Sequence, residues 1–161
     1  AMNEILVQAG GSMSSWILNR AIYSATSFRG GQAQVIQRLI QVRADVNHKY
    51  PLKAVSLHAL YLGVKGMQHR FGRVTNSTRQ CYHAWGATPL MAALLSAQYE
   101  GAAALIAAGA RIDLRNARGC TAAELVREQV LPRFLVEALQ GRPQECQDIT
   151  DMILAGKTSE V

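Results

Sequence analysis

The stretch GATPLMAA, residues 86–93, decides the fold together with the segment GCTAAELV, residues 119–126. The first glycines of the two segments are 33 residues apart, and the same interval separates Thr88 from Thr121. This spacing indicates either a chance match or a structural repeat that runs through the chain. Because a repeat protein builds its core from stacked units, self-similarity is the first hypothesis to test.

The ends of the units share a second pattern, in which two aliphatic residues and two spacers precede Gly or Arg and a small residue. It occurs in LVQAGG (residues 6–11), LIQVRADVN (residues 39–47) and LIAAGARID (residues 105–113). The first leucines of these segments are 33 and then 66 residues apart, so one period fits all three. The longer interval leaves room for one more unit, whose first helix we expect near Val55.

This pattern resembles the ankyrin repeat, whose consensus opens with G-x-T-P-L-H-x-A and closes with L-L-x-x-G-A-D-V-N. Residues 85–117 match a near-complete unit, and neighbouring segments match its opening or its ending. The match is weak in residues 52–84, where Val55 replaces the consensus Thr and the expected aliphatic pair falls on Gly72 and Arg73. The resemblance implies an all-α ankyrin-repeat solenoid of stacked helix pairs joined by extended turns.

Local signals in the best unit agree with a pair of helices. Thr88 is a good N-cap, and Pro89 suits the first helical turn, where its missing N–H costs nothing. We expect a second helix from about Glu100 to Ala108, ended by Gly109 in the left-handed conformation. One such pair cannot bury its own apolar face, so the units must stack.

The sequence therefore predicts five consecutive segments. They are the tail of a preceding repeat (1–14), a repeat with a lengthened helix–helix link (15–51), a degenerate basic repeat (52–84), the best-preserved repeat (85–117), and the last repeat with a C-terminal helix and tail (118–161). We expect the C-terminal helix to cover the end of the stack with Ile149, Met152 and Ile153 on one face. A chain that begins inside a repeat indicates a fragment of a longer array, which we favour, or a partner that covers the N-terminal face.

Composition fits a folded protein, because 49% of the residues are hydrophobic and only 17% are charged. No apolar run approaches the roughly 20 residues that span a bilayer, and no signal peptide is visible. The cysteines Cys81, Cys120 and Cys146 are odd in number and lack paired spacing, which favours free thiols. We therefore expect an intracellular protein, in the cytoplasm or another reducing compartment, without a membrane span.

The net charge of +6 belongs to the middle of the chain, where seven Lys or Arg and one acid lie between Arg43 and His83. Lys65, His69 and Arg73 stand at i, i+4 and i+8, with Arg70 beside them. This basic patch suits an acidic protein surface, a phosphate group or a nucleic acid. A solvated outer helix face is the alternative, and a nucleic-acid interface would call for more aromatic residues than the few close by.

The sequence predicts no enzyme, no cofactor and no metal site. His58, His69, Cys81 and His83 are the metal candidates, but only Cys81 and His83 stand at a short paired spacing. The resemblance implies instead that His58 bonds neighbouring turns. No set of residues assembles a nucleophile, a base and an oxyanion site.

Protein binding is the function that the ankyrin resemblance implies, through turn tips and the concave face of inner helices. Three arginines in one turn and the basic middle segment predict a partner with an acidic surface. A nucleic-acid-binding or phosphate-binding assembly module that uses residues 43–83 is the alternative. The expected contact residues are His48, Lys49, Tyr50, Gln80, Tyr82, His83, Trp85, Arg111, Leu114, Arg115, Asn116 and Arg118.

Overall fold

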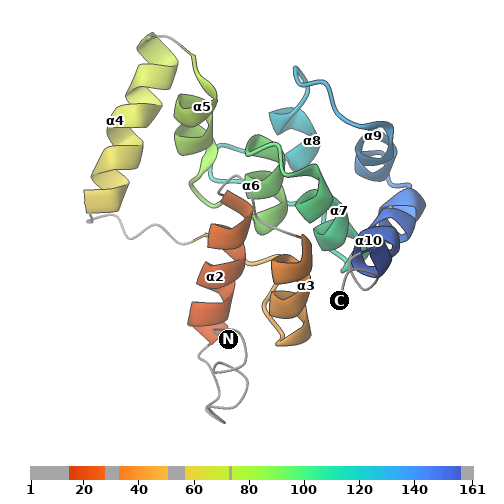
Figure 1. Ribbon diagram of the computed structural model, residues 1–161. Helices are drawn as coiled ribbons and strands as arrows, with labels where there is room; N and C mark the ends of the chain where they lie inside the picture. The colour runs from red at the N-terminus through yellow and green to blue at the C-terminus, as the bar shows by residue number, and fades with distance from the viewer. Residues whose placement is uncertain (1–14, 28–32, 51–56, 73, 157–161) are drawn as a thin grey trace.

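The computed structural model describes residues 15–27, 33–50, 57–72 and 74–156. Within these ranges the chain forms nine helices and no strand, which confirms the prediction of an all-α fold (Figure 1). The segment expected as the tail of a preceding repeat lies outside the described residues. The helices are α2 (Ser15–Ser27), α3 (Ala33–Gln41), α4 (Leu57–Phe71), α5 (Asn76–His83), α6 (Pro89–Leu95), α7 (Tyr99–Ala107), α8 (Ala122–Leu125), α9 (Arg133–Leu139) and α10 (Gln144–Gly156).

The helix starts have the caps that the 33-residue spacing predicts. The Thr88 hydroxyl accepts a bond from the N–H of Met91, and Pro89 is the first residue of α6. At α8, the Thr121 hydroxyl accepts from the N–H of Glu124, whose carboxylate accepts from the N–H of Thr121 in return. The recurrence in sequence is thus a recurrence of helix N-termini.

Four helices, α3, α6, α7 and α9, end in the same way. After each helix one residue takes the left-handed conformation, and the next N–H donates to a carbonyl five residues earlier, over 2.9, 2.8, 2.9 and 3.0 Å respectively. The left-handed residues are Arg43 (φ 67°), Ala97 (φ 57°), Gly109 (φ 85°) and Gly141 (φ 90°). Gly109 is the C-cap predicted from the sequence, whereas Arg43 adopts a conformation that glycine tolerates better.

The pair α2–α3 packs directly on the pair α6–α7, with α2 against α6 and α3 against α7 (Figure 1). On the other side, α8 packs against α6 and α9 against α7. The helix ends that recur in sequence therefore lie in successive layers. The largest fully buried apolar side chains follow this line of layers: Ile22, Ile36, Leu90, Met91, Leu94, Leu105 and Leu135.

Residues 52–84 differ from the expected arrangement, because their helices do not separate the two pairs. Helix α4 packs on α5, and α5 packs on α6 at the side of the stack (Figure 1). The N–H of Tyr50 donates to the carbonyl of Ala87 over 2.9 Å, as the N–H of Asn116 donates to the carbonyl of Cys120 over 3.0 Å in the next turn. The α4–α5 hairpin thus occupies the tip of one turn between two stacked pairs.

The length of this segment explains why the sequence spacing did not distinguish the hairpin from an intervening layer. Residues 52–84 span one full period of 33, so the units on either side keep the spacing that an intervening layer would give. The helices within the segment also differ from the single helix expected near Val55, since α4 runs to Phe71 and a separate helix, α5, follows it.

Helix α10 also differs from its expected position. It packs along α7, with further contacts to α9 and α3, and so covers the side of the layers as well as their end. Cys146 and Thr150 are buried in this contact and Ile149 is partly buried, but Met152 is 64% exposed. The side chain of Ile153 lies outside those described. Because α10 covers one side of α7 and α3 and α6 lie on others, the alanine-rich α7 is buried almost throughout.

The contact of α3 with α7 supplies a sharp test of this stacking. A Cβ atom on Gly101 would lie 2.7 Å from Cδ1 of Ile36, which is fully buried. We expect Gly101→Ala to lower the free energy of unfolding by about 1–2 kcal/mol. Ile36→Val deletes the clashing atom at a cost of about 1 kcal/mol on its own.

Urea unfolding followed by circular dichroism should show that the double variant is more stable than the sum of the two losses predicts, by about 1 kcal/mol. Gly63→Ala in α4 is the matched control, because its added Cβ meets no atom within 4 Å; it should leave stability unchanged or raise it. Strictly additive losses would contradict the direct packing of α3 on α7.

Candidate partner-binding surface

Backbone hydrogen bonds join three turn segments into one row, which we call the turn row: residues 44–50, 84–88 and 110–121. Besides the bond from Tyr50 to Ala87, the N–H of Ala117 donates to the carbonyl of Trp85 over 2.9 Å. Gly86, with φ 63°, lets the turns approach, because a Cβ there would lie 3.0 Å from the backbone N of Ala117. The turn row is therefore held in one fixed geometry.

Two of the predicted contact residues stand out on the turn row. The side chain of Trp85 is 38% exposed, and Lys49 is exposed. Neighbouring His48 and Leu114 are half-buried, and Tyr50 stacks on Tyr23 of α2 with ring centroids 4.2 Å apart. The turn row thus presents a large aromatic side chain from a rigid backbone.

Two of the three arginines in residues 110–121 form ion pairs within the chain. Arg111 forms an ion pair with Asp113 at 2.6 Å, and Arg115 forms one with Glu124 at 3.1 Å. Hydrogen bonding from Arg111 lowers the pKa of Asp113. Both pairs are well exposed, so they stabilise the fold little, but they offset the positive charge that the sequence assigned to this turn.

Two predicted contact residues hold the fold together. Asn116 is 5% exposed: its side chain donates to the carbonyl of His83 over 3.3 Å and accepts from the N–H groups of Arg118 and Cys120 at 3.0 Å each. The Gln80 side chain donates to the carbonyl of Leu95 and to the Ser96 hydroxyl, at 3.0 and 3.2 Å. Their polar atoms bond other turns and helices of the chain.

Two predicted contact residues, Tyr82 and Arg118, come together with His69 of α4. The guanidinium carbon of Arg118 lies 3.4 Å from the ring centroid of Tyr82. The Nε–H of Arg118 also donates a hydrogen bond to the backbone carbonyl of Tyr82. The Tyr82 ring in turn contacts His69 at 4.7 Å and His83 at 4.9 Å between centroids. Sequence distance hid this cluster, because Arg118 belongs to a different turn.

Charge and burial in this cluster disfavour protonated histidine. Burial above all, and then the nearby His69, Arg118 and Arg79, lower the pKa of His83 to about 4. Burial and the two arginines also lower the pKa of His69. Neither Nδ1 atom has a hydrogen-bond partner in the described part of the chain.

The predicted basic patch does not form a single stripe. His69 turns toward α5, whereas Arg70 is exposed with its guanidinium carbon 5.6 Å from the Phe71 ring centroid. Lys65 is half-buried, and Arg73 lies outside the described residues. The side chain of His58, predicted to bond neighbouring turns, also lies outside those described.

Metal ligation has no support among the side chains that the structure describes, since no three His, Cys, Asp or Glu residues come together there. Cys81, Cys120 and Cys146 are free thiols, as the sequence predicts. Burial raises the pKa of Cys81, and it raises the pKa of Cys146 to about 11, so neither thiol favours its ionised form. None of the helices in the described ranges combines the length and apolarity needed to cross a bilayer.

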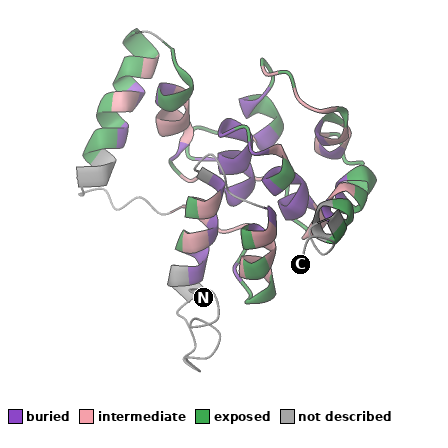
Figure 2. Ribbon diagram, viewed as in Figure 1, coloured by how far each residue is buried: buried purple, intermediate pink, exposed green. Residues whose placement is uncertain are grey.

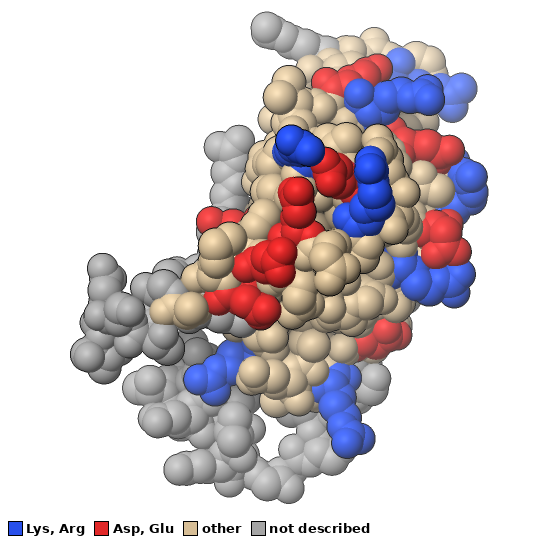
Figure 3. Space-filling model, turned by 90° about the vertical axis from the view of Figure 1, so that its right-hand side faces the viewer, with Lys and Arg blue, Asp and Glu red and all other residues tan. Residues whose placement is uncertain are grey.

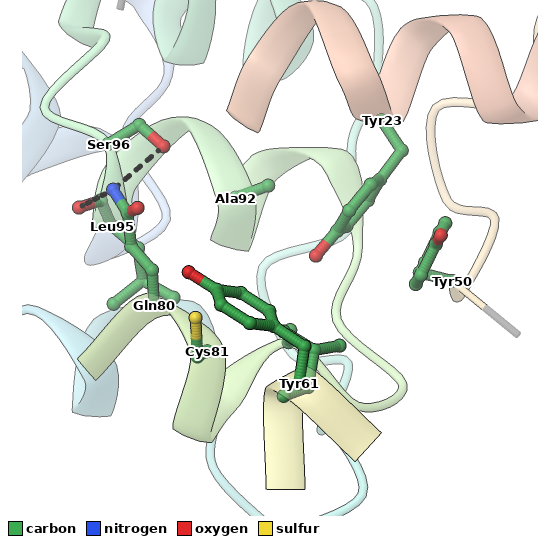
Figure 4. Close-up of a pocket in the computed structure, with 10 residues that line it drawn as sticks. Tyr23, Tyr50, Tyr61, Gln80, Cys81, Ala92, Leu95 and Ser96 are labelled. Atoms are coloured by element: carbon green, nitrogen blue, oxygen red, sulfur yellow. Dashed lines mark hydrogen bonds between the residues drawn. The ribbon is translucent and has the colours of Figure 1, made fainter. Parts of the chain in front are cut away.

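A cavity of about 170 Å³ separates the α4–α5 hairpin from α2 and α6 (Figure 4). Tyr23 and Tyr61 direct their hydroxyl groups into it, and Cys81 and Ala92 lie on its wall. Most of its surface is apolar. Sequence reasoning missed this cavity, because four elements far apart in the chain contribute to it.

Helix α4 carries a second feature that sequence reasoning missed, a row of exposed apolar side chains. Leu60, Val64, Met67 and Phe71 recur at intervals of four, three and four residues, which puts them on one face of the helix. That spacing was the available signal. It was obscured because other apolar residues, such as Tyr61 and Leu62, occur between its members in the sequence.

Comparisons with known proteins leave the family open: no protein-family model matches the chain, and no curated protein or solved structure matches it significantly. The function must therefore be argued from the geometry of the turn row and the hairpin.

The low pKa of His83 predicts that acid destabilises the fold. In the unfolded chain His83 regains its usual pKa near 6.5, so between pH 6.5 and 4 the unfolded state binds a proton that the folded state does not. Stability should therefore fall as pH drops through this window. The lowered pKa values of Asp113 and Glu124 add to this loss at the acid end of the window and below it, where the carboxyl groups of the unfolded chain begin to bind protons that the folded chain does not.

Urea midpoints measured from pH 7 to pH 4.5 test this dependence. The variant His83→Gln should lose less stability over that range than the unmodified chain, and a further His69→Gln change should flatten the curve again. Equal slopes for all three proteins would refute an acid-sensitive histidine pair.

Proposed function

We propose that this chain is an ankyrin-type stack of helix pairs that binds a protein partner and catalyses no reaction. Support comes from the N-caps at Thr88 and Thr121, one period apart, and from the shared left-handed ends of α3, α6, α7 and α9. The direct packing of α2–α3 on α6–α7 is the arrangement that such a stack requires. A binding role suits a rigid scaffold whose turns carry the exposed side chains.

The exposed Trp85 on the turn row carries this proposal. Tryptophan is enriched at the centre of protein interfaces, because it buries a large area at a small cost in conformational entropy. The Trp85 carbonyl accepts from the N–H of Ala117, and the carbonyl of Ala87, two residues further on, accepts from the N–H of Tyr50, so the indole stands on a preorganised backbone. Lys49 on the same row adds a positive charge.

Charge supports an acidic surface on the partner. No Asp or Glu occurs from residue 46 to residue 99, which includes α4, α5 and two parts of the turn row. By contrast, acidic and basic side chains are interspersed on the face that carries α9 and α10 (Figure 3). A partner attracted by this asymmetry should bind more weakly as salt is added.

A photo-crosslinking amino acid at position 85 tests the proposal. Introduced into the full chain in its native cells, it should yield a defined crosslinked protein, whereas the same amino acid at Val130, which is 94% exposed away from the turn row, should not. Once the crosslinked protein is identified, Trp85→Ala should weaken its binding at least about tenfold.

Three results would count against the proposal. They are identical crosslinking from positions 85 and 130, unchanged affinity for Trp85→Ala, and capture that disappears after nuclease treatment. The last result would favour the nucleic-acid alternative. Binding that is indifferent to salt would reject the acidic partner surface while leaving protein binding intact.

A further inference from the structure

Helix α4 packs on α5 through one face and leaves an apolar outer face exposed. Leu62, 6% exposed, and the buried Gly66 lie in the contact with α5. A Cβ at Gly66 would lie 3.6 Å from the Tyr82 ring, which is an ordinary van der Waals distance, so the two helices are in close contact there. Figure 2 shows α4 at the edge of the molecule, with most of its ribbon coloured as exposed.

The outer side of α4 bears what we call the α4 stripe: Leu60, Val64, Met67 and Phe71. Their exposed fractions are 65%, 51%, 65% and 79%, respectively. Single exposed apolar residues are ordinary in folded proteins, but four in succession on one helix face form a continuous surface. Such a surface is typical of helices that bind something apolar.

Positive charge borders the α4 stripe. Arg70 is next to it by helical spacing and lies beside the Phe71 ring, whereas the half-buried Lys65 falls on the side toward α5. A second copy of this chain, paired stripe to stripe, would bring two Arg70 side chains to one interface with no acid from residues 46–99, because these contain none. The occupant is therefore anionic as well as apolar.

The shape around the α4 stripe favours a surface over a helix as the occupant. Helix α4 is the outermost element on its side of the molecule, and its neighbour α5 lies on the opposite face (Figure 1). No stripe residue lines the cavity of Figure 4. A partner helix binds best in a groove with two walls, whereas lipid chains conform to a single ridge.

We propose that α4 binds the surface of an anionic membrane, with the α4 stripe inserted among the acyl chains and Arg70 at the level of the headgroups. Long basic side chains at the border of an apolar helix face reach the lipid phosphates in this way. The membrane contact is peripheral. It is independent of partner binding through Trp85.

Vesicle sedimentation with the full chain tests the proposal. The protein should bind phosphatidylcholine vesicles that contain phosphatidylserine more strongly than vesicles of phosphatidylcholine alone. Met67→Glu and Phe71→Glu should each weaken binding to the anionic vesicles at least about tenfold, because each puts a like charge into the inserted face. Arg70→Glu should weaken it as well.

Val130→Glu is the matched control, since this exposed valine lies far from α4 in sequence, in the loop between α8 and α9. It should bind vesicles as the unmodified chain does. Circular dichroism of every variant establishes that the helices are retained.

Insertion itself is read from Phe71→Trp. Brominated acyl chains should quench the emission added by the new tryptophan, which separates insertion from attraction to the headgroups alone. Trp85→Ala should leave vesicle binding unchanged, so failure of this proposal and failure of the partner proposal are distinguishable.

The proposal is overturned if anionic vesicles are not bound, if Met67→Glu and Phe71→Glu bind as well as Val130→Glu, or if the tryptophan at position 71 is not quenched. Binding of an acidic protein at α4 without binding of vesicles would overturn it in favour of a protein occupant.

Discussion

One backbone hydrogen bond, from the N–H of Tyr50 to the carbonyl of Ala87, joins the two halves of the structure. It closes a turn whose tip contains the whole α4–α5 hairpin, so the chain returns to the point it left. With the turn closed, α6–α7 lies directly on α2–α3, and Ile36 reaches Gly101. The buried line of side chains from Ile22 to Leu135 depends on this return.

Local chemistry made the ends of helices α6 and α7 predictable. Thr88, Pro89 and Gly109 act through their own backbone neighbours, so sequence alone indicated the helix that they begin or end. The position of the α4–α5 hairpin was not predictable from spacing, because residues 52–84 have the length of one period. Only contacts between distant segments distinguish an inserted hairpin from an intervening layer.

The candidate site was harder to predict, for two physical reasons. A polar residue in a turn can face a partner or bond the next turn, and Asn116 does the latter. A charged residue can be offset by a carboxylate close by in the fold, as Arg115 is by Glu124. The α4 stripe escaped notice because apolar residues such as Tyr61 and Leu62 lie between its members in the sequence, so its spacing does not stand out.

The closed turn has a consequence for how such a protein changes over evolutionary time. Since Tyr50 and Ala87 are neighbours in space, the segment between them leaves the scaffold and returns to it at the same place. The next turn closes in the same manner between Asn116 and Cys120, with only three residues, 117–119, at its tip. A lineage could therefore gain, lose or exchange the α4–α5 hairpin as one module, while the layers beneath it keep their sequence and their packing.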